Sequence, residues 1–393
     1  MDTRKKSKLS VALLCLLIGF PQISESIFTP ILPTLSKALK VTDSNIQLTV
    51  SIYFIGFALG VLIWGILSDK YGRKPIMLMG ILIYLLGNIS LLYSNSFYLI
   101  MMSRFIQAFG ASVGSVITQA IMRESYSGSK ATKIFATVGA VISIAPAIGP
   151  IIGAQLVTHF HYMSVFLFLI VLAIILLILT SVKLPETNLM KVDYSLKALI
   201  TVAFRLLKDK FVLLNAFAIA VFNAILFNFY SEAPFIFINN LKLSTSAYGN
   251  TGILIALGTI TGAYVVNKSA VKTNSFNVIR LGICIAVACS IFSIWAFSSA
   301  NILMIYIAIF GIFLGINIAL PVILKTSLNA YEEVIGIASG IFGLMYYCMI
   351  GILTFIMSII HTGNILVFPI YTLALAIGLS ILIFVNKSSY KNV

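Results

Sequence analysis

The chain has 393 residues, of which 60% are hydrophobic and 9% are charged, and its mean hydropathy is +1.08. A soluble domain cannot bury this much apolar surface, because only roughly half of a typical soluble protein is apolar. The net charge of +15 therefore indicates membrane orientation and not nucleic-acid binding, since the basic residues follow the loops between apolar runs.

Twelve apolar runs follow one another, and each is long enough to cross a bilayer as a helix of about 20 residues. Strands of a membrane barrel have about ten residues of alternating polarity, so these runs predict helices. The predicted fold is an all-α membrane protein with twelve transmembrane helices in two six-helix halves. The predicted spans are 10–34, 46–67, 75–94, 97–122, 132–156, 162–182, 211–238, 247–266, 276–297, 301–324, 335–359 and 364–386.

The lysines and arginines predict the orientation of these spans. Of the 26, 22 lie in the N-terminus, in the loops after even-numbered spans or in the tail, whereas Lys37, Lys40 and Lys242 lie on the other side. Cytoplasmic loops carry an excess of basic residues, so both termini are expected in the cytoplasm, with the chain in the cell (inner) membrane. No cleavable signal is expected, because the first apolar run continues through Pro33.

The longest polar stretch divides the spans into two sets of six. We predict an N-terminal half at 1–182, a cytoplasmic linker at 183–210 and a C-terminal half at 211–393. The linker is expected to hold an amphipathic helix around 196–207. Two such halves, related along the membrane normal, form a known transporter plan with the substrate between them.

The first helices of the two halves show a weak repeat. Glu25 precedes Pro30 in the first span, and Glu232 precedes Pro234 in the seventh. Each pair puts a carboxylate and a proline near the outer end of its helix.

Residues 65–75 read Gly-Ile-Leu-Ser-Asp-Lys-Tyr-Gly-Arg-Lys-Pro and concentrate charge between the second and third spans. The glycines permit a sharp turn, and Pro75 suits the first position of the next helix. Asp69 lies within reach of Arg73. The residues predict a tight loop at the membrane surface.

This loop resembles the signature between helices 2 and 3 of the major facilitator superfamily. The fourth span resembles that superfamily's Arg-x-x-Gln-Gly pattern at Arg104 and Gln107, with Ala108 in place of the glycine. The fifth span resembles the Gly-Pro-x-x-Gly-Gly pattern of drug–proton antiporters. With Pro30 and Pro33, the chain is similar to the Bcr/CflA branch of twelve-helix drug exporters. The residues of this antiporter helix are Gly139, Pro146, Gly149, Pro150 and Gly153.

The resemblance implies two mechanical roles. The loop would be a cytoplasmic gate that holds the two halves together when the cavity faces outward; snorkelling bases at a membrane end are the alternative. The antiporter helix would seal a leak path in exporters, whereas close packing alone is the alternative for its small residues. The gate residues are Gly65, Asp69, Gly72 and Arg73.

Glu25 lies about two-thirds of the way across the first span. A charged carboxylate near the bilayer centre costs a few kcal/mol, so Glu25 faces a cavity or a partner, or it is protonated. Burial favours the neutral form, and such a carboxylate can load and release a proton. We predict that it carries the coupled proton or binds a cationic substrate, with a structural acid as the alternative. Relatives in the similar branch carry an aspartate one residue later, where this chain has Ser26.

Two other charged residues are assigned to proton coupling. Arg104 is the only base within a span, and we predict a polar network in which it favours the charged form of Glu25 when the two are close. Glu232 is predicted to act in coupling or cation binding, or to lie at the outer water boundary.

A few aromatic and polar residues are expected to line an apolar cavity for amphipathic substrates. The candidates are Tyr53, Asn223 and Tyr346, for which contact with lipid or the interface is the alternative.

The remaining residues offer no sign of other chemistry. The histidines His159, His161 and His361 lie in predicted outer loops without metal-ligand company. No nucleotide-binding loop and no catalytic set is present in the sequence. We therefore expect no enzyme, no metal site and no cofactor, with the proton gradient as the energy source.

The predicted function is proton-coupled export, by alternating access, of small amphipathic compounds or drugs. This means multidrug efflux and antibiotic resistance by a monomeric antiporter in contact with lipid. The alternatives are a dedicated exporter of a metabolite or siderophore, and an importer or uniporter of a small nutrient. A membrane sensor or non-transporting scaffold is a third class, but the sequence has no extra soluble domain through which to signal.

Overall fold

The computed structural model describes residues 10–188, 191–192, 194–269, 274–387 and 390, and in them it contains helices and no strand. Twelve of its helical spans are long and apolar enough to cross a membrane, which confirms the predicted fold class. Some of the basic residues that predict the orientation lie outside the described residues: Arg4, Lys5, Lys6, Lys8, Lys272 and Lys391.

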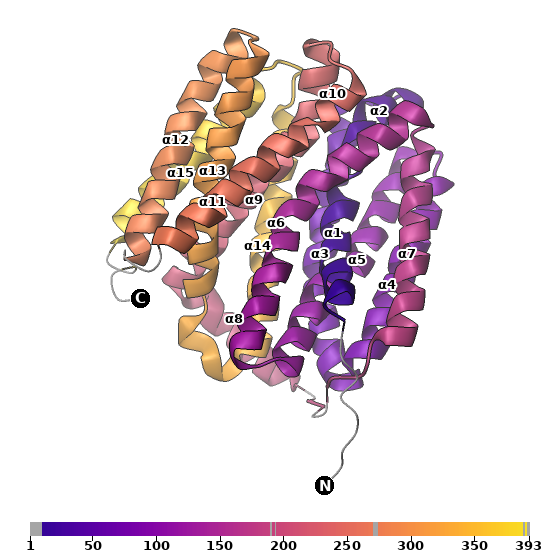
Figure 1. Cartoon of the computed structure of the whole chain (residues 1–393), viewed down its shortest axis with the longest axis vertical. Coiled ribbons are helices and arrows are strands. Elements are labelled where there is room, and N and C mark those ends of the chain that lie inside the picture. The colour runs from indigo at the N-terminus through magenta and orange to yellow at the C-terminus, as the bar shows by residue number, and fades with distance from the viewer. Residues whose placement is uncertain (1–9, 189–190, 193, 270–273, 388–389, 391–393) are drawn as a thin grey trace.

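The helices run back and forth along the long axis of the molecule (Figure 1). In chain order they are α1 (Val11–Ser26), η1 (Thr29–Ile31), α2 (Leu32–Leu39), α3 (Asp43–Tyr71), α4 (Arg73–Leu92), α5 (Phe97–Ser125), α6 (Gly128–His159), α7 (Met163–Lys183), α8 (Leu196–Lys208), α9 (Lys210–Pro234), η2 (Phe235–Asn240), α10 (Thr245–Gly249), α11 (Thr251–Ser269), α12 (Ser275–Ser298), α13 (Ile302–Thr326), η3 (Asn329–Val334), α14 (Ile335–Ile360) and α15 (Val367–Val385).

The first helix of each set of six is broken close to its acidic residue. α1 ends at Ser26, and the 3-10 turn η1 and the short helix α2 follow, with Pro30 and Pro33 in their first turns. A proline fits there because the missing N–H has no intrahelical acceptor at that position. α9 ends at Pro234 and continues as the π-helical turn η2. The weak sequence repeat therefore corresponds to a repeated change of helix type.

Helices from each part of the chain pack mainly with one another. α3 and α4 pack on α5, and α1 packs on α6; in the second part, α12 and α11 pack on α13, and α14 packs on α9. Figure 1 shows the first set, indigo to magenta, beside the second set in orange and yellow. The sets meet where α3 contacts α14 and where α6 contacts α10 and α11. The linker carries α8, which confirms the amphipathic helix expected around 196–207 and buries Val202 and Leu206.

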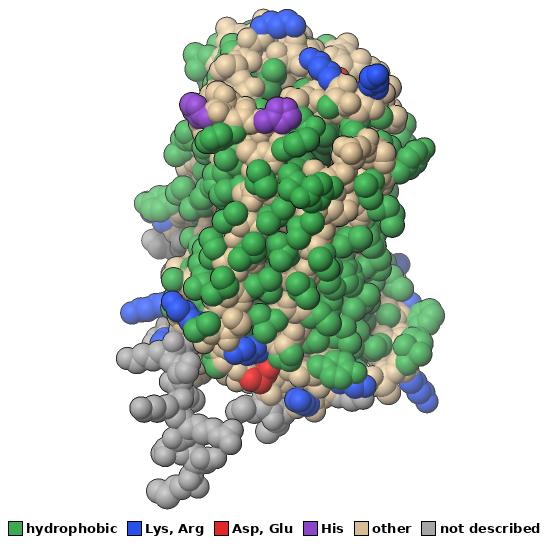
Figure 2. All heavy atoms as spheres, turned by 90° about the vertical axis from the view of Figure 1, so that its right-hand side faces the viewer, with side chains coloured by type: hydrophobic (Ala, Val, Ile, Leu, Met, Phe, Trp, Pro, Cys, Tyr) green, Lys and Arg blue, Asp and Glu red, His purple; other side chains and the backbone are tan. Residues whose placement is uncertain are grey.

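The outer surface has an apolar middle and charged ends. Figure 2 shows one face as a broad band of hydrophobic side chains with lysines and arginines near both ends. Hydrocarbon is the solvent that fits such a band. We call one end the basic end, because α3 and α5 finish there beside Lys70, Lys74 and Arg123. The end that carries α2 and η2 is called the opposite end.

Candidate functional site

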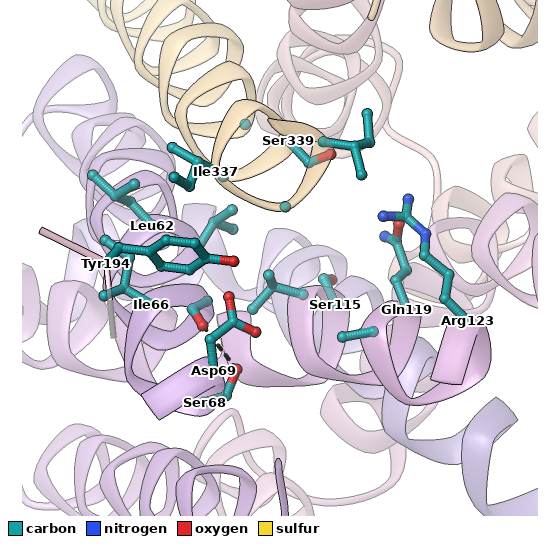
Figure 3. A pocket seen from close by; sticks show the side chains of 18 of the residues that line it. Leu62, Ile66, Ser68, Asp69, Ser115, Gln119, Arg123, Tyr194, Ile337 and Ser339 are labelled. Carbon is teal, nitrogen blue, oxygen red and sulfur yellow. Dashed lines mark hydrogen bonds between the residues drawn. The ribbon is translucent and has the colours of Figure 1, made fainter. Parts of the chain in front are cut away.

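A cavity of about 320 Å³ lies at the basic end between α3, α5 and α14. Figure 3 shows Gln119 and Arg123 of α5 on one side, with Asp69 and Tyr194 on another. Residues of α14, including Ser339, close it from the second half of the chain. The cavity thus lies between helices of both sets, where an alternating-access protein would hold its substrate.

The predicted gate residues do come together beside this cavity. Arg73 pairs with Asp69 at 2.5 Å, and its Nη2 pairs with Oε1 of Glu124 at 2.6 Å. Arg73 Nη1 also donates to Ser68 Oγ at 2.6 Å. All of these partners belong to the first half, so in this conformation the pairs do not hold the two halves together. This agrees with a gate that is open at the end where the cavity lies.

The linker is fastened to the same loop by hydrogen bonds that the local pattern did not predict. Oε1 of Glu186 accepts from the backbone N–H of Arg73 at 2.8 Å, and Asn188 Nδ2 donates to the carbonyl of Asp69 at 2.8 Å. Tyr194 lies beside Asp69, and burial together with that carboxylate raises the pKa of the Tyr194 phenol. The gate is therefore a structure of loop, α5 and linker together.

Gly72 has a backbone conformation that excludes side chains. Its φ is +112° and its ψ is 156°, a region that is occupied almost only by glycine. A Cβ at this position would also come within 2.5 Å of Oε2 of Glu186. The glycine therefore fixes both the turn and the approach of the linker.

We expect Gly72→Ala to destabilise the protein by about 1–3 kcal/mol, because the new side chain meets both backbone strain and the Glu186 carboxylate. Thermal unfolding of the purified protein would measure the change. Gly139→Ala is the matched control, because a Cβ at Gly139 meets no atom within 4 Å. An unchanged melting temperature for Gly72→Ala would contradict the argument.

Glu25 is buried, with only 6% of its surface exposed, and its Oε1 has no hydrogen-bond partner. The predicted network with Arg104 contains no ion pair between the two within 4.0 Å in the described part of the chain. The Arg104 guanidinium lies instead between the rings of Phe28 and Tyr53, 4.3 and 4.4 Å from their centroids. Arg104 Nη1 donates to Gln107 Oε1 at 2.5 Å. The charge of Arg104 still acts on Glu25 through space.

The antiporter helix, α6, packs on α1 directly beside Glu25. A Cβ on Gly149 would collide with Ser26 Oγ and lie 2.8 Å from the backbone nitrogen of Ile27. A Cβ on Gly153 would collide with the carbonyl oxygen of Ile27. Gly139 makes no such approach, so the small residues of this motif do not share one packing role. Pro146 and Pro150 lie inside the helix.

Of the three predicted cavity residues, Tyr346 lines the cavity, and its ring lies 4.4 Å from that of Tyr347. Tyr53 and Asn223 are not among the lining residues. The Tyr53 hydroxyl donates to the carbonyl of Pro21 at 3.2 Å, and Asn223 Nδ2 donates to a carbonyl of its own helix. Sequence reasoning missed the polar lining from α5, which has the helical spacing of four between its members: Ser115, Gln119 and Arg123.

The opposite end is closed by contacts between the two halves. Thr29 and Tyr248 share a hydrogen bond of 3.0 Å between their hydroxyls, and Ser44 donates to the carbonyl of Ser358. Glu232 is only 2% exposed, near the end of α9. Its partners at this end include the side chain of His361. Within the described residues, no group of three His, Cys, Asp or Glu side chains could hold a metal ion.

Comparisons with known proteins agree with this architecture. A family model described as the Major Facilitator Superfamily matches residues 14–354. The chain is 37% identical over 383 residues to an uncharacterized transporter of Rickettsia felis, with 94% of each chain covered. It is 28% identical over 367 residues to a chloramphenicol resistance protein of Pseudomonas aeruginosa, which covers 90% of this chain and 85% of the relative.

The fold also resembles that of a solved transporter. The xylose transporter XylE from E. coli, in a partially occluded inward open conformation, matches with a TM-score of 0.76 at 10% identity. The match covers 95% of this chain and 96% of that chain. At this identity the likeness concerns the fold alone.

Proposed function

The chain belongs to the major facilitator superfamily, and we propose that it is a proton-coupled exporter of small amphipathic compounds, drugs among them. The solved structure of similar fold is also that of a transporter. The proposal includes its place in the Bcr/CflA-like branch and in the inner membrane. The name of the Pseudomonas aeruginosa relative, a chloramphenicol resistance protein, supports drug export. The motif of α6 supports the direction, because it resembles that of drug–proton antiporters.

The observation that carries proton coupling is the state of Glu25. Its carboxyl group is buried, has an oxygen without a hydrogen-bond partner, and forms no ion pair with Arg104 in the described part of the chain. Burial of a charged carboxylate without a partner is unfavourable in free energy, and binding of a proton removes that charge.

The position of the cavity at the basic end suggests the order of steps in the transport cycle. The excess of basic residues at the basic end supports a cytoplasmic position for that end. The substrate would enter there, while the contacts at the opposite end keep the other side closed. Reversal of the two closures would release the substrate outside and admit a proton to Glu25. The aromatic wall at Tyr346 and Tyr347 and the polar groups Gln119 and Arg123 would suit a compound with an apolar body and a polar group.

An importer or a uniporter of a small nutrient, and a dedicated exporter of a metabolite or siderophore, are the competing functions on this fold. The direction of proton-driven movement separates export from import. Everted vesicles turn the basic end outward, so an antiporter would load them when their interior is acidic.

We expect acid-interior everted vesicles that contain the protein to accumulate chloramphenicol above the level of vesicles without it. Dissipation of the pH gradient with a protonophore should remove the difference. Radiolabelled drug retained on filters would measure it. Accumulation only when the proton gradient is reversed would contradict export and favour proton-coupled import.

A further inference from the structure

Three side chains at the opposite end form a buried polar contact between the two halves. Gln47 lies on α3, Glu232 lies near the end of α9, and His361 directly follows α14. Gln47 Nε2 donates to Glu232 Oε1 at 2.8 Å. His361 Nδ1 lies 2.8 and 3.0 Å from the two carboxylate oxygens of Glu232. The side chains of His361 and Glu232 are 6% and 2% exposed, so water does not share this contact to any large extent.

If Glu232 is ionised, its distances to His361 Nδ1 call for a hydrogen on that nitrogen, as in the imidazolium or in the neutral Nδ1–H tautomer. An ionised Glu232 only accepts hydrogen bonds, so both Gln47 Nε2 and His361 Nδ1 must donate to it. Gln47 Nε2 and His361 Nδ1 also lie 3.1 Å apart, but two donors do not form a hydrogen bond with one another. The carboxylate therefore joins the halves, because it accepts one hydrogen bond from a side chain of α3 and one from a side chain that follows α14. If it is protonated, it loses its capacity to hold both in this way.

The charges around His361 favour its protonated form. The titratable groups that act on it are Glu232 from α9 and Asp43 from the start of α3. Phe235 of η2 packs on the ring at 5.3 Å and adds no charge. Burial lowers the pKa of His361, but the hydrogen bond and charge of Glu232, with the charge of Asp43, outweigh it and raise that pKa above its usual value.

We propose that His361 and Glu232 form a proton-binding site that latches the opposite end through Gln47, and that loss of the His361 proton releases the latch. This inference rests on the alternating access of the proposed function, but on no particular substrate. Glu25 and this site lie on different helices, so the chain has a second titratable site, which controls the outer closure. The site is assigned to a proton, because both carboxylate oxygens of Glu232 already accept hydrogen bonds within the contact, while Gln47 Oε1 has no hydrogen-bond partner.

The sign of the pH dependence follows from the two charges. With His361 protonated and Glu232 ionised, the contact is an ion pair and the opposite end stays closed. When His361 loses its proton, the Glu232 charge remains buried without a counter-charge, which is strongly unfavourable. Opening of this end hydrates the carboxylate and relieves that cost. The closed state is therefore fully favoured below the ordinary histidine pKa, about 6.5, and is lost as the pH rises through the raised value.

Distance measurements on the purified full-length protein can test the latch without a substrate. Spin labels on cysteines at Tyr98 and Leu303, after removal of the four native cysteines, would report the separation of the halves at the opposite end. Both positions are exposed, at 80% and 64%, and begin helices of different sets at this end. The comparison is between pH about 6 and pH about 9, on either side of the ordinary histidine range.

The expected result is a population of longer distances that grows at least about threefold between the two pH values in the wild type. His361→Gln should make the distances independent of pH, whereas His161→Gln, at an exposed histidine of the same end, should leave the wild-type response. Glu232→Gln, as a second variant, should move the midpoint of the transition to lower pH. A wild type without a pH response, or a His361→Gln protein that keeps it, would overturn the latch. Loss of drug accumulation with this response intact would overturn only the proposed function.

Discussion

Replacement of Glu25 by glutamine is expected to reduce gradient-driven accumulation to the level of vesicles without the protein. Glutamine has nearly the same shape as glutamate, but it cannot bind and release a proton. If Glu25 carries the coupled proton, the variant loses the link between the pH gradient and the movement of substrate. The measurement is drug retention in acid-interior everted vesicles, made beside the wild type at equal amounts of protein.

The structure indicates that this variant will remain folded. Glu25 Oε1 has no hydrogen-bond partner to lose, and the residue has no ion pair with Arg104 in the described part of the chain. A neutral amide also costs less to bury than a carboxylate. We therefore expect a free energy of unfolding within about 1 kcal/mol of that of the wild type, or higher.

Two further variants decide what a loss of accumulation means. Glu332→Gln removes an exposed acid beyond the end of α13 and should leave accumulation unchanged. Glu25→Asp keeps a titratable group in the same place and should retain part of the coupling. Full coupling in the glutamine variant would remove Glu25 from the mechanism and leave the site of Glu232 and His361 as the remaining candidate.

The bilayer makes the fold of this chain readable from its sequence. A helix that crosses hydrocarbon must be apolar over its whole length, so twelve runs predicted twelve spans. The linker helix was predictable for a related reason, because apolar residues recur at the helical period in a polar segment. The breaks after Ser26 and Pro234 were not predicted in detail. They depend on how the chain packs at the opposite end, and the prolines alone fit either a straight or a broken span.

Some contacts of the candidate sites could be predicted from the sequence, and others could not. Asp69 and Arg73 are four residues apart on either side of the turn at Gly72, and so short a connection keeps the two side chains within reach of each other, so their pair was predictable. The partner Glu124 is 51 residues from Arg73, and no local pattern joins them. His361 and Glu232 are 129 residues apart. Their contact exists only because the ends of α9 and α14 meet, which is why an isolated histidine in a predicted loop gave no sign of a partner.

Arg104 illustrates a different limit of sequence reasoning. The prediction treated charge as the only means to satisfy a buried arginine. The guanidinium is also planar and weakly hydrated, so aromatic faces and an amide oxygen can hold it. Phe28, from the turn after α1, and Tyr53 of α3 provide those faces. Glu25 is thereby left without a direct counter-ion, which is the condition that suits a carboxyl group for proton exchange.

Gly149→Leu is expected to abolish transport and to destabilise the protein by about 1–3 kcal/mol, the usual cost of forcing extra atoms into a packed interior. The leucine would meet Ser26 Oγ and the backbone of Ile27, one and two residues beyond Glu25. Backbone atoms cannot move aside as a flexible side chain can, so α1 and α6 must separate at this point. The separation would admit water beside Glu25 and let protons pass without substrate, so we expect a faster collapse of an imposed pH gradient in proteoliposomes.

Gly139→Leu is the matched control on the same helix, because a Cβ there meets no atom within 4 Å. Equal losses in both variants would mean that α6 tolerates no large residue anywhere, and the contact beside Glu25 would then have no special part in holding back protons.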